Sequence, residues 1–199
     1  MKVNENVRET VINNSILISD NTANPSPLGL MGFGMSTVLL NLHNLGLFEL
    51  SSMVLSVGFF YGGLGQIFAG IMDWKKKNTF GTTAFTSYGL FWISLVSLIL
   101  LPKMGIASPA GHMEMGFFLL MWGIFTLGMA FATLKLGRKL QVVFFSLAVL
   151  FFLLAAGDFL QNLMITKVAG AIGIFCGLSA IYAGFTAVFF AVNKGVKTK

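Results

Sequence analysis

Six runs of about 20 apolar residues follow one another along the chain, and short polar segments separate them. A helix that rises about 1.5 Å per residue needs about 20 residues to cross the hydrocarbon core of a bilayer. Each run therefore predicts one transmembrane helix, and the fold class is an all-α membrane protein with six transmembrane helices. The helices are expected at residues 26–46, 51–72, 80–101, 115–134, 140–158 and 168–192.

The composition agrees with burial in lipid. Only 10% of the 199 residues are charged, against about a quarter in an ordinary soluble domain. The net charge of +6 does not indicate a nucleic-acid partner, because Lys and Arg form short clusters between the apolar runs instead of covering one face. The single cysteine, Cys176, lies inside an apolar run and excludes an intrachain disulfide.

The distribution of basic residues predicts the orientation, because Lys and Arg in short loops are retained on the cytoplasmic side. With the amino terminus inside, 11 of the 13 basic residues fall in inner segments, and only Lys103 and Lys167 fall outside. We expect a multi-pass protein of the plasma membrane with both termini in the cytoplasm. Residues 1–23 and 193–199 would be cytoplasmic tails, and residues 24–192 the transmembrane domain.

Neutral polar side chains, and no charged ones, lie deep within the runs. Phe33, Thr37, Asn41 and Asn44 are spaced four, four and three residues apart, which places them on one face of a helix. Such a face is compatible with the lining of a water-filled path and with hydrogen bonding between helices. His43 is interpreted as a hydrogen-bonded structural residue, with a pH-sensitive element as the alternative.

The sequence contains no motif that predicts catalysis. It lacks a Ser, His and acid constellation, a His-rich motif with ligand spacing and a phosphate-binding glycine loop. We therefore expect no enzyme activity, no catalytic residue, no cofactor and no metal site.

The first run opens with a motif that resembles a known signature. It reads Asn24-Pro25-Ser26-Pro27-Leu28-Gly29-Leu30, similar to the N-P-x-P-L-G-L sequence of the acetate uptake transporters, also called the succinate-acetate permease family. Later segments are similar to bacterial members as well. They include Phe60-Tyr61-Gly62-Gly63, Gln66-Ile67-Phe68-Ala69-Gly70, Thr86-Ser87-Tyr88-Gly89 and Ser179-Ala180-Ile181-Tyr182.

The resemblance covers residues 24–192 and implies a function. It implies a pore through each subunit of a homohexamer, and passage of acetate and related small carboxylates, including succinate. The family's usual description implies proton coupling, and a passive channel is the alternative. It also implies a hydrophobic constriction formed by Phe33, Tyr88 and Leu147. We further assign six residues to pore lining or substrate contact: Thr37, Asn41, Asn44, Gln66, Thr86 and Ala180.

The expected helix boundaries are consistent with that constriction. Phe33, Tyr88 and Leu147 each lie seven or eight positions after the start of an inside-to-outside run, a common depth of roughly 11 to 12 Å. Gln66 falls near the same level in the second run. Pairing the runs as consecutive hairpins also suggests a degenerate threefold repeat.

Two other functions fit parts of the pattern. A channel for small neutral solutes such as urea or ammonia would use a similar uncharged path. A membrane scaffold without transport would use the polar face only to join helices.

Overall fold

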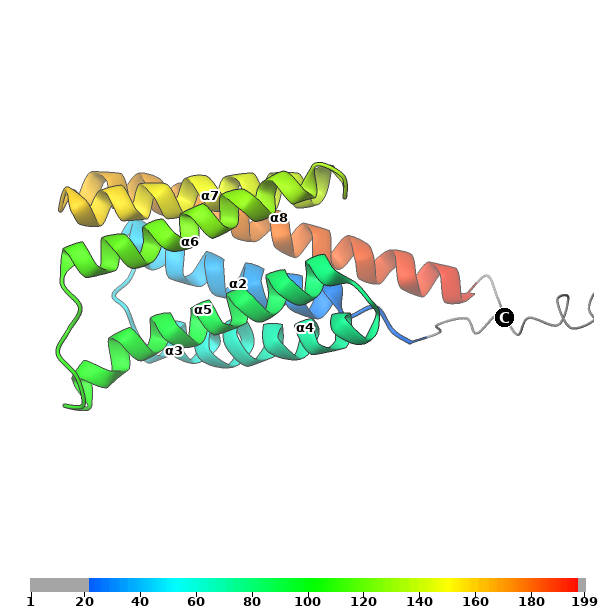
Figure 1. Ribbon diagram of the computed structural model, residues 1–199, viewed down its shortest axis with the longest axis horizontal. Coiled ribbons are helices and arrows are strands. Elements are labelled where there is room, and N and C mark those ends of the chain that lie inside the picture. The colour runs from blue at the N-terminus through cyan, green and yellow to red at the C-terminus, as the bar shows by residue number, and fades with distance from the viewer. Residues whose placement is uncertain (1–21, 197–199) are drawn as a thin grey trace, which may run out of the picture.

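The computed structural model describes residues 22–196 and folds them into long helices joined by short turns (Figure 1). In chain order the elements are α2 (Ser26–Leu45), α3 (Ser52–Ser56), the π-helix η1 (Val57–Gly65), α4 (Gln66–Lys75), α5 (Thr79–Lys103), α6 (His112–Thr133), α7 (Arg138–Phe159) and α8 (Leu163–Val196). Because α3, η1 and α4 join without a break, they form one continuous rod, Ser52–Lys75. The described residues thus form six rods, and the predicted all-helical fold is confirmed.

Within the described residues, five of these rods are long and apolar enough to cross a membrane. The sixth, α2, is less apolar than the others. Its polarity comes from residues such as Asn41, His43 and Asn44. The tertiary structure tolerates them because α2 contacts α8, η1, α4 and α5, and lies between the two groups of helices in Figure 1. A transmembrane helix that is covered by other helices needs less apolar surface than one that faces lipid.

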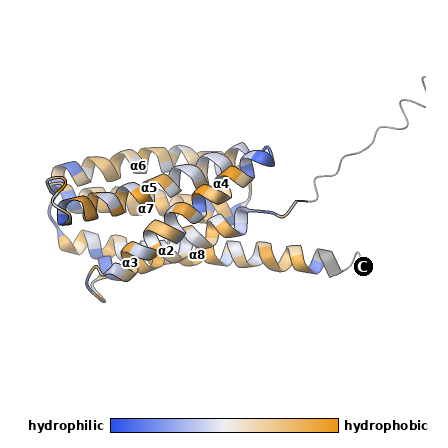
Figure 2. Ribbon diagram, turned by 90° about the horizontal axis from the view of Figure 1, so that it is seen from below, coloured by the Kyte–Doolittle hydropathy of each residue, from blue (hydrophilic) through white to orange (hydrophobic). Residues whose placement is uncertain are grey.

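Polar residues lie mainly at the two ends of the helix bundle. Figure 2 shows hydrophilic residues at both ends and apolar residues along the length between them. The α4–α5 and α6–α7 turns lie at the end where α2 begins and where α8 extends past its neighbours (Figure 1). We call this the basic end, because its turns contain Lys75, Lys76, Lys77, Lys135, Arg138 and Lys139.

Some boundaries differ from those expected from the sequence. α8 begins at Leu163, because the Asn162 side chain accepts a hydrogen bond from the Met164 amide at 2.9 Å, and it continues to Val196. Lys167 therefore belongs to the helix and not to the preceding loop. Asp73, expected in a loop, is buried in the last turn of α4, where its Oδ1 accepts a hydrogen bond from Asn78 Nδ2 at 3.1 Å. Residues 1–21 and 197–199, which make up most of the two expected tails, lie outside the described residues.

Glycines bring particular pairs of helices into backbone contact. A Cβ atom on Gly34 would lie 2.7 Å from the carbonyl oxygen of Gly177, and one on Gly177 would lie 2.7 Å from that of Gly34. On α5, a Cβ atom on Gly89 would likewise lie 2.7 Å from the carbonyl oxygen of Gly63. The α2–α8 and η1–α5 pairs therefore share one close-packing geometry.

The third close pair is α6 with α7. The closest pairs are therefore α2 with α8, the α3–η1–α4 rod with α5, and α6 with α7. These pairs differ from the consecutive hairpins that the sequence suggested. Short turns, residues 76–78 and 134–137, connect α4 to α5 and α6 to α7. The first and last helices, α2 and α8, have no such connection and are brought together by small residues such as Gly34 and Gly177.

Candidate transport path

Three helices that begin at the basic end each contribute one side chain to a narrow neck. Phe33 of α2, Tyr88 of α5 and Leu147 of α7 are buried and line a cavity of about 20 Å³ together with Gln66. The Phe33 and Tyr88 rings lie 5.9 Å apart between centroids. A volume of this size accommodates about one water molecule, so the neck is closed to larger solutes in this conformation. The complete lining consists of Leu30, Phe33, Gln66, Ala84, Phe85, Tyr88, Val143, Phe144 and Leu147.

A second ring of large side chains lies one helical turn nearer the basic end. Leu30, Phe85 and Phe144 each precede a residue of the first ring by three positions, a spacing that keeps both residues on one helical face. All three line the neck and the wider cavity next to it. These three residues were not among those predicted to line the pore, although they lie one helical turn before the three predicted constriction residues.

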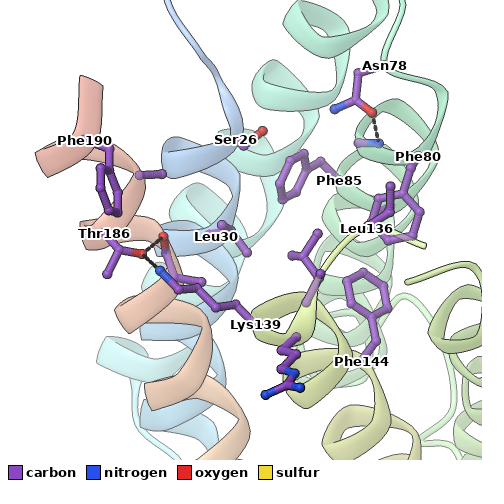
Figure 3. A pocket seen from close by; sticks show the side chains of 17 residues that line it. Ser26, Leu30, Asn78, Phe80, Phe85, Leu136, Lys139, Phe144, Thr186 and Phe190 are labelled. Atoms are coloured by element: carbon purple, nitrogen blue, oxygen red, sulfur yellow. Dashed lines mark hydrogen bonds between the residues drawn. The ribbon is translucent and has the colours of Figure 1, made fainter. Parts of the chain in front are cut away.

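The wider cavity opens at the basic end and has a volume of about 600 Å³. We call it the vestibule. Figure 3 shows Phe80, Phe85 and Phe144 on one side of it and Lys139 and Thr186 on the other. Its lining consists of Ser26, Leu30, Asn78, Phe80, Gly81, Ala84, Phe85, Leu136, Gly137, Arg138, Lys139, Leu140, Phe144, Ala183, Thr186, Ala187 and Phe190.

Two basic side chains at the start of α7 give the vestibule a cationic rim. Lys139 Nζ donates a hydrogen bond to Thr186 Oγ1 at 2.8 Å and lies 5.2 Å from the centroid of the Tyr182 ring. Arg138 lines the same cavity. In the sequence both residues indicated only the orientation, because their proximity to the cavity depends on how α7 packs against α8.

Helix termini add to this positive potential. Ser26, Asn78 and Gly137 lie at the starts of α2, α5 and α7, and all three line the vestibule. The amino-terminal end of a helix carries a partial positive charge because its first amides have no intrahelical partner. The vestibule is therefore electrostatically suited to a small anion.

Packed aromatic rings cover Tyr88 on the side of α6. The Tyr88 ring lies 5.6 Å from Phe125 and 6.1 Å from Trp122, and Trp122 lies 5.1 Å from Phe91. The Tyr88 hydroxyl is hydrogen-bonded to Thr126 Oγ1 at 2.9 Å. These rings therefore hold Tyr88 in place from the side of α6.

The other residues assigned to the path lie elsewhere. Asn41 Nδ2 donates to the Thr37 carbonyl at 2.8 Å, and Asn44 Nδ2 donates to Asn41 Oδ1 at 3.1 Å. A Cβ atom on Gly173 would overlap the Asn41 side chain, which places Asn41 in the α2–α8 interface. This placement favours hydrogen bonding and packing between helices over substrate contact.

Thr86 and Ala180 are also placed by helix packing. A Cβ atom on Gly70 would overlap Thr86 Oγ1, so Thr86 faces α4, and Ala180 is completely buried on α8. Neither residue lines the vestibule or the neck, and the same is true of Thr37, Asn41 and Asn44. Of the six residues assigned to pore lining, the structure brings only Gln66 to the neck.

A bundle of apolar helices in which a vestibule with two basic residues leads to an apolar neck has the features of a membrane transporter or channel. The chain belongs to the GPR1/FUN34/yaaH family, whose model matches residues 12–197. The resemblance to the acetate uptake transporters is thereby confirmed.

Individual relatives and a solved structure agree with this family. The chain is 58% identical over 160 residues to the succinate-acetate/proton symporter SatP of Escherichia coli K12, covering 80% of this chain and 85% of SatP. It is 36% identical over 180 residues to the ammonia transport outward protein 2 of Saccharomyces cerevisiae, covering 86% of this chain and 64% of that protein. A structure of the bacterial acetate channel SatP matches with a TM-score of 0.84 and 56% identity, covering 85% of this chain and 93% of that one.

Proposed function

We propose that this protein carries acetate and related small carboxylates across the plasma membrane, through the vestibule and neck of each subunit. The observation that carries the proposal is the ring of Phe33, Tyr88 and Leu147, which closes the deep end of the vestibule, opposite its opening at the basic end. These residues come from three helices far apart in the sequence. Relatives named as a succinate-acetate/proton symporter and an acetate permease support the substrate class.

The geometry divides the passage into two steps. Arg138, Lys139 and the helix termini raise the local concentration of carboxylate in the vestibule. The neck then admits a solute only after most of its hydration shell is removed and the aromatic rings around it shift. An apolar constriction of this kind selects by size and by the cost of dehydration.

The orientation in the membrane is proposed from the distribution of basic residues, and the oligomeric state from the family resemblance. The basic end faces the cytoplasm in this proposal, so that the vestibule opens inward, because the turns at that end contain Lys75, Lys76, Lys77, Lys135, Arg138 and Lys139. The functional unit is a homohexamer, as the sequence resemblance implies. Mass measurement of the detergent-solubilised complex tests this number.

Transport of a small neutral solute is the second candidate. It is favoured by the absence of charged side chains among the nine residues that line the neck, and by the relative named for ammonia transport. Urea belongs to the same class of solute.

Uptake into proteoliposomes separates the candidates. Purified protein is reconstituted, and uptake of labelled acetate, succinate, urea and ammonium is compared with uptake by protein-free liposomes. We expect saturable, protein-dependent uptake of acetate. Protein-dependent uptake of urea or ammonia without uptake of acetate would favour the neutral-solute channel, and no uptake of any of them would contradict a transport function.

A further inference from the structure

The vestibule is much larger than the substrate proposed for it. Its volume of about 600 Å³ lies within the range of about 300 to 1,000 Å³ that is typical of sites for drug-sized organic ligands. Acetate, with its two carbon atoms, fills only a small part of this space. The neck beyond it has a volume of about 20 Å³. The structure therefore joins a cavity that accommodates a larger molecule to a neck that such a molecule does not enter in this conformation.

The charged groups of the vestibule point to an anion. Arg138 and Lys139 line the cavity, and its lining contains no Asp or Glu side chain. Within the part of the chain that the structure describes, neither basic residue forms a salt bridge. The Lys139 ammonium group contacts only neutral partners, Thr186 Oγ1 and the rings of Tyr182 and Phe190. Both positive charges therefore remain open to a carboxylate, and the planar guanidinium group matches its two oxygens.

Two of the three neutral polar side chains of the vestibule are already paired within the protein. Asn78 Nδ2 donates to Asp73 Oδ1 at 3.1 Å, and Asn78 Oδ1 accepts from the Gly81 amide at 3.0 Å. Thr186 Oγ1 donates to the Ala183 carbonyl at 2.9 Å, besides accepting from the lysine described above. The cavity therefore offers few hydrogen bonds to the body of a ligand, which disfavours a molecule that is polar along its whole length.

The remaining wall is apolar and aromatic. Figure 3 shows Phe80, Phe85 and Phe144 on the side of the vestibule away from Lys139. The Phe80 and Phe144 rings lie 5.1 Å apart between centroids, so they form one continuous surface. Leu30 joins this surface where the vestibule meets the neck. Hydrocarbon that covers such a wall stabilises a complex in proportion to the apolar area removed from water.

The spacing of residues along α7 sets the length of a ligand that spans the cavity. Lys139 and Phe144 are five positions apart, which corresponds to about 7.5 Å along a helix. Leu147 of the neck lies eight positions from Lys139, or about 12 Å. An extended hydrocarbon chain advances about 1.25 Å per carbon, because its bonds are about 1.5 Å long and meet at about 111°. A chain of about six to ten carbons therefore reaches from the basic rim to the neck.

These features together describe an amphipathic anion. A carboxylate with a linear apolar chain is ionised at pH 7, so its charge suits Arg138 and Lys139 and its chain suits the aromatic wall. Resting on the proposed function, we infer that the vestibule is a binding site for medium-chain carboxylates of about six to ten carbons, which block the path of acetate. Blocking requires no change of conformation, because the neck is already closed to the chain.

Binding is measured separately from transport. The purified full chain in phosphatidylcholine nanodiscs is equilibrated with labelled octanoate, and empty nanodiscs give the background. We expect saturable binding, and competition by unlabelled acids should strengthen about threefold to fourfold per methylene from butyrate to octanoate. Octylammonium, with the same chain and the opposite charge, should not compete, and equal competition by it would overturn the inference. Displacement of octanoate by added phosphatidylglycerol would assign the cavity to an anionic lipid instead and would also overturn it.

Substitutions test the two parts of the site. Replacing both Arg138 and Lys139 by Gln should weaken octanoate binding about tenfold, because each exposed charge contributes at most about fivefold. Lys135→Gln removes an exposed charge of the same turn that does not line the vestibule, and should leave binding unchanged. Phe144→Ala should weaken octanoate binding more than butyrate binding, since only the longer chain reaches that ring. Thermal melting verifies that each variant is folded, and the rim variant replaces only exposed residues.

Inhibition of acetate uptake into proteoliposomes connects binding to transport. Octanoate should inhibit with a constant close to its Kd in nanodiscs, and labelled octanoate should enter no faster than it enters protein-free liposomes. Absence of saturable binding, an equal effect of Lys135→Gln and the rim variant, or protein-dependent octanoate uptake would overturn the inference and leave the proposed function standing. Octanoate binding without any protein-dependent acetate uptake would instead contradict the proposed function.

Discussion

Phe33 shows how a single side chain can set the width of the proposed path. Only 6% of its surface is exposed, and its ring packs 5.9 Å from that of Tyr88. It belongs to α2, which contacts α8, η1, α4 and α5. Lys139 acts on the same path at longer range, through its charge.

Replacement of Phe33 by Ala should widen the neck. We expect uptake of a bulky acid such as benzoate to rise by about tenfold or more relative to acetate, because size exclusion is lost. Labelled uptake into proteoliposomes measures the ratio. Phe60→Ala is the matched control, since Phe60 is 64% exposed on the outer surface of the bundle. An unchanged ratio in a folded Phe33→Ala protein would exclude Phe33 from the constriction.

Replacement of Lys139 by Gln should weaken attraction of the anion to the vestibule. We expect KM for acetate to rise about twofold to fivefold at low salt, because an exposed charge contributes at most about 1 kcal/mol. The difference from wild type should shrink as ionic strength rises. Lys103→Gln, which removes an exposed lysine at the opposite end of α5, should leave KM unchanged. An equal effect of both substitutions would show that net charge, and not the vestibule, is responsible.

At the scale of the helices, small residues decide which elements pack together. Gly34 and Gly177 bring α2 and α8 into backbone contact, and Gly63 and Gly89 do the same for η1 and α5. In α2, α5 and α7 a small residue directly follows the constriction residue: Gly34 follows Phe33, Gly89 follows Tyr88 and Ala148 follows Leu147. Helix packing and closure of the neck are thus coupled through neighbouring positions.

Gly177→Ala should therefore destabilise the bundle. The added methyl group would clash with the Gly34 backbone, at a cost of about 1 to 3 kcal/mol. We expect a lower Tm in detergent. Gly128→Ala is the control, because nothing lies within 4 Å of a Cβ atom there and Ala is the better helix former by about 0.5 to 1 kcal/mol. A Tm for Gly177→Ala at or above that of the wild type would contradict the packing argument.

On the scale of the whole molecule, the two ends of the helix bundle differ in their basic residues and in the presence of the vestibule. The basic turns and the start of α2 share one end of the bundle (Figure 1). Ser26, Arg138 and Lys139 of these segments line the vestibule, which therefore lies at the same end. This arrangement makes the orientation in the membrane directly measurable.

Single cysteines test that orientation. In a Cys176→Ala background, Ser108→Cys places an exposed thiol at the end opposite the basic end, and Lys135→Cys places one at the basic end. We expect an impermeant maleimide to label Ser108→Cys in intact cells and Lys135→Cys only after permeabilisation, because the basic end faces the cytoplasm. The reverse labelling pattern would overturn the orientation and the inward-facing vestibule. Cys176 is completely buried, so substituting it removes no exposed group.

The sequence alone determined that this chain forms six long helices and belongs to a transporter family. It also indicated that Phe33, Tyr88, Leu147 and Gln66 share one depth, because the rise per residue is constant in every helix. Hydropathy and helical rise are local properties, so they can be read along the chain.

Only the tertiary structure decided which face of each helix points to the path. Asn41 and Thr86 have the polarity expected of lining residues, yet they pack against Gly173 and Gly70. Lys139 lies beside Thr186, 47 residues away, because α7 and α8 are neighbours. Gln66 likewise reaches the neck because residues of α2, α5 and α7 meet beside it. Such contacts depend on the packing of helices distant in the sequence, which hydropathy and periodicity within a single helix do not encode.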